Sequence, residues 1–534
     1  MKDLKKKAVR GGFAKLCGQA ANLLIRVVTL MILARLLDPT DFGLVAMVTV
    51  FTGVLSLFRD FGLSTAMIQQ KDISEAQIST LFWINVLIGV LLAAIAAGSA
   101  WLVAGFYHEP RLVWITLALA TSVLLNAVGV QHAALLKRQM RFTTIAVIDL
   151  TSLVISSATG IGMAVAGFGY WALVGMTVAL PLASSAFAWL AAAWLPGWPQ
   201  RQAGIRAMLR FGGTITLNGV VVYAAYNLEK VLLGRFWGAD ALGIYGRAYQ
   251  LVSIPTENLN GAIGEVAISA LSRIKDDAER LRSYFLKGYS LVVTVTLPIT
   301  IACALFAEEL ILLVLGAKWG EAAPVFRFLA PTIVIYAMIN PLWWLLVSLG
   351  LADRSLRIAL VFTPLVMASY VIGLPYGPTG VALAYSTFMT LWLIPHIAWC
   401  IHGTAVSLRD IAFAVSGPLL SAVIAAAIAW AILAYAFGTA SSLTRLLIGM
   451  PVLFAAYAVL LLCVMGQKSF YLDLLRVLLD KPARDEGIAR SSTIAAPMDP
   501  RKSRPGMRPA TTGSEFAATP SSRPRSPPTT PGSG

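Results

Sequence analysis

The sequence predicts an all-α, polytopic membrane protein of about 14 transmembrane helices. Of its 534 residues, 58% are hydrophobic and only 13% are charged, which is far from the composition of soluble globular proteins. The apolar residues form runs of about 20 or more, long enough for helices to cross a bilayer and too long for the strands of a membrane barrel. Lysine and arginine gather in the loops between these runs. The net charge of +16 therefore indicates membrane topology and argues against nucleic-acid binding.

A window of about 20 residues places the helices in order along the chain. We expect membrane spans at residues 11–37, 41–66, 78–104, 111–136, 143–167, 170–195, 208–236, 240–271, 285–306, 323–349, 354–375, 377–402, 411–436 and 444–466. The segment 310–326, between the ninth and tenth spans, is amphipathic, which is also typical of a re-entrant or interfacial piece. The first span follows a basic lead and is too long for the apolar region of a signal peptide, so we interpret it as a retained helix.

The orientation of the helices follows from the loops that carry lysine and arginine. Basic residues occupy the N-terminus and alternate loops: Lys5, Lys6, Lys7, Lys137, Arg138, Arg141, Arg201, Arg206, Arg210, Arg273, Lys275, Arg280, Arg282, Lys287, Arg354 and Arg357. The opposite set of loops is almost free of them. We therefore expect both termini to be cytoplasmic.

An internal repeat at a spacing of roughly 200 residues divides the chain. GGFAKLCG at 11–18 resembles GGTITLNG at 212–219, and ARLLDPTDFGLVAM at 34–47 resembles GRFWGADALGIYGR at 234–247. Each pair opens a half of six helices, so the two halves are parallel repeats related by an axis along the membrane normal. Transporters built from such repeats place the substrate site at the junction of the halves.

The repeat and the composition predict four regions. We expect six-helix halves at 1–200 and 201–405, around a central cavity. Two extra transmembrane helices and a juxtamembrane segment follow at 406–480. The remainder, 481–534, is rich in proline, serine, threonine and arginine, and we interpret it as a disordered, basic cytoplasmic tail.

Polar residues spaced three or four apart form one stripe on each of the first two helices of each half. The stripes are Lys15, Gln19, Asn22, Arg26 and Thr29; Thr49, Thr52, Ser56 and Arg59; Thr216, Tyr223, Asn227 and Lys230; and Arg247, Gln250, Ser253, Glu257 and Asn260. One shift aligns the stripes of the two halves, while the loop between each pair of helices aligns one residue out of step. A charge near the bilayer centre costs several kcal/mol unless it faces protein or water. The stripes therefore predict either structural ion pairs or a hydrated central cavity.

Two further residues lie among these stripes. Glu229 is off the stripe of its helix, because adjacent helix positions point about 100° apart, and is expected to face a neighbouring helix. Pro255 removes a backbone hydrogen bond and should kink its helix near Glu257. Such a bend would either serve as a hinge or simply be tolerated.

Several other functions lack their motifs. The chain contains no GxxxxGK[ST] phosphate loop, so energy should come from an ion gradient, the membrane potential or the substrate's own gradient. Its four histidines do not have the spacing of metal ligands, and no loop on the outer side is long enough to hold an active site. We therefore expect neither an enzyme nor a resident cofactor.

Six segments resemble the polysaccharide transport family. They are KKKAVRGG at 5–12, ARLLDPTDFGLVAMV at 34–48, LLKRQMRF at 135–142, FGYWALV at 168–174, GRAYQLVSIPTENLNGAIGEVAISALSRI at 246–274 and LPYGPTGVALAYS at 374–386. The family comprises the Wzx-type flippases of lipid-linked oligosaccharides, including the colanic acid exporters. Its superfamily also holds multidrug antiporters and the lipid II flippase. The resemblance covers nearly all of residues 1–466.

The resemblance implies two six-helix bundles that face each other across a central cavity, with two extra helices, in the bacterial cytoplasmic (inner) membrane. It implies export by alternating access. The pyrophosphate and sugars of an undecaprenyl-linked repeat unit would enter a cationic cavity while the lipid tail stays among the membrane lipids. A lipid-linked oligosaccharide would be the substrate, and a polysaccharide polymerase and a chain-length regulator would be protein partners.

Four basic residues on the stripes suit the phosphates of such a substrate: Arg26, Arg59, Lys230 and Arg247. Asn22, Asn227, Gln250, Glu257 and Asn260 complete the predicted substrate-binding set. The alternative function is an ion-coupled multidrug or metabolite antiporter, which would require an acidic cation site to dominate the cavity. Cations outnumber acids on the stripes, which favours an anionic cargo. A membrane-embedded assembly protein without transport is a third alternative.

Overall fold

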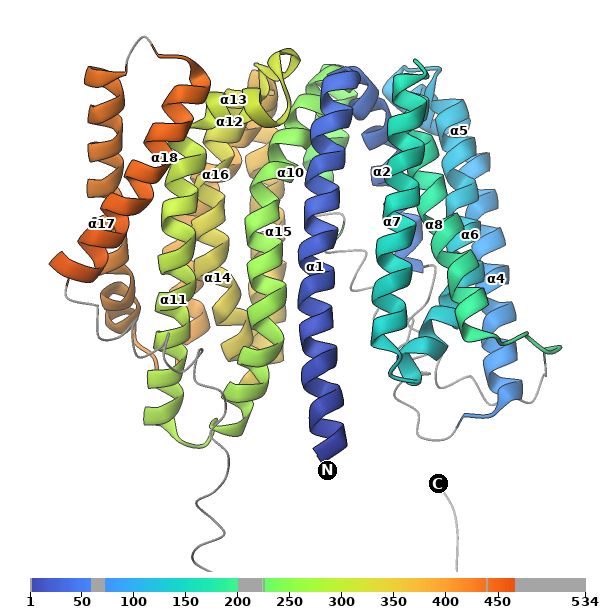
Figure 1. Cartoon of the computed structure of the whole chain (residues 1–534), viewed down its shortest axis with the longest axis horizontal. Helices are drawn as coiled ribbons and strands as arrows, with labels where there is room; N and C mark the ends of the chain where they lie inside the picture. The colour runs from blue at the N-terminus through green and yellow to red at the C-terminus, as the bar shows by residue number, and fades with distance from the viewer. Residues whose placement is uncertain (1, 59–72, 200–222, 224–225, 438–439, 466–534) are drawn as a thin grey trace, which may run out of the picture. The chain divides into compact units, whose positions relative to one another are not determined.

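The computed structural model describes residues 2–58, 73–199, 223, 226–437 and 440–465 (Figure 1). Within these ranges the chain is helical and contains no strand. The helices are α1 (Lys2–Leu36), α2 (Pro39–Phe58), α4 (Glu75–Gly98), α5 (Ala100–Tyr107), α6 (Leu112–Arg138), α7 (Phe142–Val165), α8 (Tyr170–Ala192), α10 (Leu228–Arg273), α11 (Ala278–Leu305), α12 (Ala307–Val314), η1 (Ala317–Trp319), α13 (Ala322–Leu329), α14 (Pro331–Ser348), α15 (Ala352–Gly373), η2 (Leu374–Tyr376), α16 (Gly377–Ile401), α17 (Leu408–Ala436), α18 (Ser442–Val459) and η3 (Leu460–Val464).

Among the described residues, 11 helical stretches are long and apolar enough to cross a membrane. One of these stretches, Asp353–Ile401, contains both α15 and α16. The predicted span 208–236 lies largely outside the described residues, so the number of 14 stays a prediction. The amphipathic segment 310–326 contains the end of α12, the short helix η1 and the beginning of α13, which accounts for its weak resemblance to a single span.

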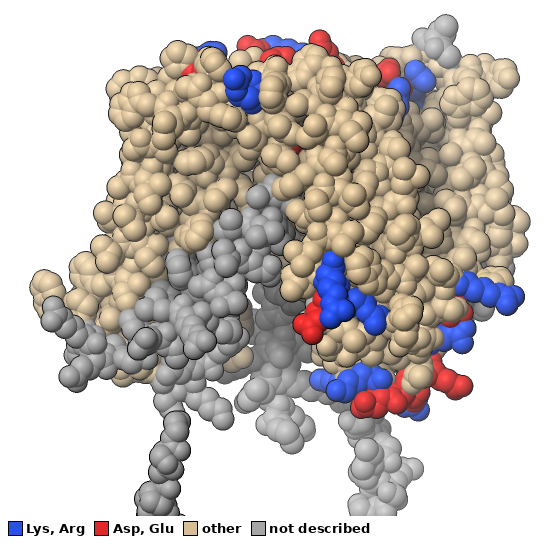
Figure 2. Space-filling model, turned by 180° about the vertical axis from the view of Figure 1, so that it is seen from behind, with Lys and Arg blue, Asp and Glu red and all other residues tan. Residues whose placement is uncertain are grey.

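The surface has the character expected of a protein in a bilayer. On the face shown in Figure 2, charged side chains gather toward the upper and lower parts, and the broad belt between them is nearly free of charge. Large apolar side chains lie open on the helices: Leu102 is 75% exposed and Leu391 is 71% exposed. Contiguous exposure of this kind is costly in water but is satisfied by lipid.

The two helices that open the second half of the chain are joined at a single glycine. The element α10 runs through Gly238, where φ is 82° and ψ is −173°, and this residue interrupts the helical dihedral angles. A positive φ of this size is readily adopted only by glycine. This break lies between the predicted spans 208–236 and 240–271. Pro255 lies within α10.

A reciprocal contact between α2 and α10 links the two halves. A Cβ atom added to Gly43 would lie 1.7 Å from the Ala239 carbonyl oxygen, and one added to Gly243 would lie 1.9 Å from the Pro39 carbonyl oxygen. The Thr40 hydroxyl also donates to Asp240 Oδ1 at 3.2 Å, across an interval of 200 residues. Each glycine thus packs directly against backbone atoms of the other helix. We call residues 39–43 and 239–243 the repeat junction.

The α12–α13 segment packs over the α1–α2 turn, at the end of the protein opposite the N-terminus (Figure 1). Trp319 is fully buried, and its indole Nε1–H donates to the Ala34 carbonyl at 2.8 Å. Its ring meets Phe42 edge to face, with centroids 5.3 Å apart. The Lys318 ammonium lies 2.7 Å from Asp38 Oδ1. These contacts join the two halves of the chain at this end.

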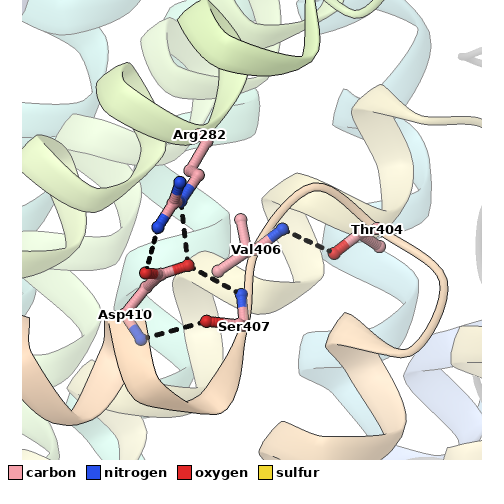
Figure 3. A network of polar contacts seen from close by, with 5 residues as sticks. All are labelled: Arg282, Thr404, Val406, Ser407 and Asp410. Atoms are coloured by element: carbon pink, nitrogen blue, oxygen red, sulfur yellow. Dashed lines mark hydrogen bonds and ion pairs between the residues drawn. The ribbon is translucent and has the colours of Figure 1, made fainter.

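A different polar network lies at the end of the helices on the same side as the N-terminus, and Figure 3 shows it. Ser407 and Asp410 form a capping box at the start of α17, with Ser407 N–H donating to Asp410 Oδ2 at 2.9 Å. Arg282, near the start of α11, donates through Nε to the same carboxylate oxygen at 2.9 Å and through Nη2 to the other. The pair ties α11 to α17 beside the basic loops that the sequence places at this end.

Candidate functional site

A cavity of about 370 Å³ lies between α10 and the helices α1, α2, α7 and α8. Its charged lining residues are Arg26 and Arg247, so we call it the arginine cavity. The uncharged polar residues of the lining are Thr29, Thr49, Ser156, Ser157, Thr177 and Gln250. No carboxylate is among the described lining residues. The cavity is therefore positively charged, which favours an anion in a site of low dielectric constant.

Arg247 is held in place from two sides. Its guanidinium carbon lies 4.6 Å from the centroid of the Phe42 ring, which is a cation–π contact. Its Nη1 donates to Gln250 Oε1, one helical turn further along α10. The buried Nε has no hydrogen-bond partner among the described residues, and no described carboxylate forms an ion pair with this arginine. The planar guanidinium is thus oriented while part of its donor capacity stays unused.

Arg26 approaches the same cavity from α1. The side chain is exposed and forms no ion pair with the described residues. One turn later the buried Thr29 hydroxyl donates to Ser157 Oγ at 2.9 Å, which fixes this part of α1 against α7. The two arginines therefore come from the first and the eighth predicted helices. Two guanidinium groups on one cavity can share the oxygens of a phosphate or pyrophosphate.

The structure brings together only part of the predicted site. Arg26, Arg247 and Gln250 line the arginine cavity. Lys230 and Asn227 instead contact each other, with Lys230 Nζ donating to Asn227 Oδ1 at 2.7 Å, and neither lines this cavity. Asn22 is half-buried and also lies outside the lining. Arg59 lies outside the described residues, as do the side chains of Glu257 and Asn260.

Several lining residues escaped the sequence analysis. Ser156 and Ser157 on α7 and Thr177 on α8 face the cavity, although only the first two helices of each half were expected to form it. Ser152 and Ser156 lie one turn apart on α7, a spacing that could have indicated a polar face. Phe42 is apolar, so a search for polar stripes could not find it, yet its ring contacts the Arg247 guanidinium and helps to orient it.

Glu229 is buried away from the arginine cavity. It is 1% exposed, and neither carboxylate oxygen has a hydrogen-bond partner among the described residues. The expected pairing with a neighbouring helix is therefore not seen in the part of the chain that the structure describes.

Comparison with known proteins gives consistent results. A family described as "Polysaccharide biosynthesis protein" matches residues 32–324. The chain is 31% identical over 337 residues to the teichuronic acid biosynthesis protein TuaB of Bacillus subtilis, a match that covers 62% of this chain and 69% of that protein. It is 28% identical over 390 residues to the lipopolysaccharide biosynthesis protein WzxC of Escherichia coli, covering 72% of this chain and 78% of that protein.

Among solved structures, the inward closed conformation of the lipid II flippase MurJ has a similar fold. The TM-score is 0.68 at 14% sequence identity, and the match covers 88% of this chain and 100% of that chain. The likeness confirms the predicted all-α, polytopic membrane fold.

Proposed function

Because this chain belongs to the polysaccharide biosynthesis protein family, we propose that it is a flippase for undecaprenyl-pyrophosphate-linked polysaccharide repeat units in the bacterial cytoplasmic membrane. The arginine cavity carries this proposal. Arg26 and Arg247 line it from opposite halves of the chain, and the described lining contains no carboxylate. A pyrophosphate is the charged part of such a substrate, and guanidinium groups satisfy phosphate oxygens better than lysine does where two oxygens are contacted at once.

In the proposed mechanism the two halves, 1–200 and 201–405, alternate around this cavity. The pyrophosphate would bind from the cytoplasmic side, where the basic loops and both termini lie, while the undecaprenyl tail stays in the bilayer. The repeat junction and the α12–α13 segment close the other end. These contacts would have to separate before the substrate could leave. A polysaccharide polymerase and a chain-length regulator would act after release.

The lining of the arginine cavity also separates this function from the alternative. An ion-coupled multidrug antiporter would need an acidic group that faces its cargo, and the described lining of the arginine cavity contains none. Glu229 is buried outside this cavity, and Asp149 lines a separate one. The proposed cargo therefore has a negatively charged head group.

Binding of purified, full-length protein to undecaprenyl pyrophosphate and to uncharged undecaprenol tests the proposal. We expect the pyrophosphate to bind at least about tenfold more tightly, since hydrogen bonds to charged groups contribute about 1.5–3 kcal/mol each. Arg247→Gln and Arg26→Gln should each remove most of this difference. In cells, Arg26→Ala and Arg247→Ala should reduce surface polysaccharide while the protein still inserts.

Arg111→Gln is the matched control, because this arginine is half exposed, pairs with Glu109 at 2.8 Å and does not line the arginine cavity. It should leave binding unchanged. Equal affinity of the wild-type protein for the two lipids, or full affinity in both Arg26→Gln and Arg247→Gln, would contradict the proposed function.

A further inference from the structure

A second cavity of about 250 Å³ lies between α10, α14 and the residues just before α10. Its lining differs sharply from that of the arginine cavity, because it contains three tyrosines and several small polar residues and no charged group among the described residues. We call it the tyrosine cavity. Its tyrosine and small polar lining residues include Tyr226, Tyr249, Ser253, Thr256, Tyr336 and Asn340.

Two helix faces form most of its wall. Tyr336 and Asn340 are four residues apart on α14, as are Tyr249 and Ser253 on α10, so each pair lies on one face of its helix. The tyrosine rings are braced from outside the cavity. Tyr336 and Tyr385 share a hydrogen bond between their hydroxyls at 2.5 Å. The ring of Tyr249 stacks on that of Tyr245, with centroids 6.2 Å apart and planes within 16°.

The polar groups of the wall are arranged to meet a ligand rather than one another. The hydroxyls of Ser253 and Thr256 donate to backbone carbonyls of their own helix, at 3.0 Å and 2.8 Å, which leaves their oxygens as acceptors. The Asn340 side chain is half-buried and makes no hydrogen bond to the described residues, so its amide offers both donors and an acceptor.

The tyrosine cavity adjoins the arginine cavity through α10. Arg247 and Gln250 line the arginine cavity, whereas Tyr249 and Ser253 line the tyrosine cavity. The Ser253 hydroxyl donates to the Gln250 carbonyl, so the two walls meet within one helical turn. A ligand with a charged group in one cavity could place an adjacent uncharged group beside the other.

We propose that the tyrosine cavity binds an uncharged sugar ring of the lipid-linked repeat unit, next to the pyrophosphate in the arginine cavity. This inference rests on the proposed function. A pyranose carries hydroxyls that both donate and accept, which suits the Asn340 amide and the Ser253 and Thr256 oxygens, and its apolar CH faces pack against aromatic rings such as those of the three tyrosines. The volume of about 250 Å³ lies just below the usual range of sites for drug-sized molecules, which suits one ring rather than an oligosaccharide. A lipid tail would need a uniformly apolar wall, and a metal cation would need carboxylates.

The test uses purified, full-length protein in lipid nanodiscs. Its probes are undecaprenyl pyrophosphate and the same lipid bearing glucose, galactose or N-acetylglucosamine. We expect at least one sugar-bearing lipid to bind the wild-type protein about tenfold more tightly than the sugar-free lipid. Asn340→Leu and Ser253→Ala should each lower that ratio several-fold and leave the affinity for the sugar-free lipid unchanged. Arg247→Gln should weaken binding of all the lipids together.

Asn126→Leu serves as the matched control. The Asn126 amide donates to the Ser122 carbonyl at 3.0 Å, and this residue lines a separate cavity between α6, α7 and α8. The variant should keep the full sugar preference. If no sugar-bearing lipid binds better than the sugar-free one, or if both tyrosine-cavity variants keep the preference, the sugar site is wrong while the proposed function stands. If undecaprenyl pyrophosphate binds no better than undecaprenol, the proposed function itself fails.

Discussion

The repeat junction and the arginine cavity are built from the same helices but packed in opposite ways. At the junction, Gly43 and Gly243 allow the backbones of α2 and α10 to touch. One residue before Gly43, the Phe42 ring turns toward Arg247, which lies one turn beyond Gly243 and helps to line the cavity. Backbone contact between the two helices thus gives way to contact between side chains within a single turn. Side-chain size at a few positions decides which part of the interface is sealed and which stays hollow.

This difference separates stability from binding. At the junction, Gly43 and Gly243 are buried against backbone atoms, so their substitution should change the free energy of unfolding or of this closed arrangement. Cavity residues face space that a ligand would fill, so their substitution should change affinity and transport with little effect on folding. Gly43→Ala and Gln250→Leu test the two sides of this division, and Trp319→Phe tests a contact that packs against the junction through Phe42.

Gly43→Ala should have the largest effect on stability. The added methyl would meet the Ala239 backbone carbonyl, which cannot rotate away as a side chain can. Overpacking usually costs about 1–3 kcal/mol, and a backbone obstacle should place this variant at or above the upper value. Thermal unfolding in detergent measures the loss. Gly246→Ala, on the same interface helix α10, is the control, because its Cβ would meet nothing within 4 Å. Equal unfolding temperatures of the two variants would mean that the junction is not close-packed.

Trp319→Phe should cost less. The change removes the indole N–H that donates to the Ala34 carbonyl at 2.8 Å and leaves that acceptor unsatisfied in a buried site. We expect a loss of about 1–3 kcal/mol, measured by the same unfolding experiment. Trp343→Phe, at a position that is 50% exposed on α14, should change little. A Trp319→Phe protein as stable as this control would show that the indole hydrogen bond to Ala34 does not stabilise this end of the protein.

Sequence patterns could predict the fold class and part of the site for identifiable physical reasons. Long apolar runs indicate membrane helices directly. The three-residue spacing of Arg247 and Gln250 predicts that they share one face of a helix, and both line the arginine cavity. A stripe gives the face of a helix but not its rotation toward a neighbour, so the spacing that put Lys230 and Asn227 on one face could predict their contact but not that both lie outside the lining of the arginine cavity. The role of Phe42 depends on a contact across more than 200 residues, which periodicity along one helix cannot reveal.

Gln250→Leu should have the smallest effect on stability and is therefore the sharpest test of the cavity side. Gln250 accepts a hydrogen bond from Arg247 Nη1 and faces the arginine cavity, so the similarly sized leucine would leave the packing of α10 in place. The free energy of unfolding should stay within about 0.5 kcal/mol of the wild-type value. Affinity for undecaprenyl pyrophosphate should nevertheless fall about threefold to tenfold, because the Arg247 guanidinium loses the partner that orients it and its mobility must be restrained on binding. A variant that unfolds several degrees earlier while binding normally would place Gln250 with the junction residues and erase the distinction between the two regions.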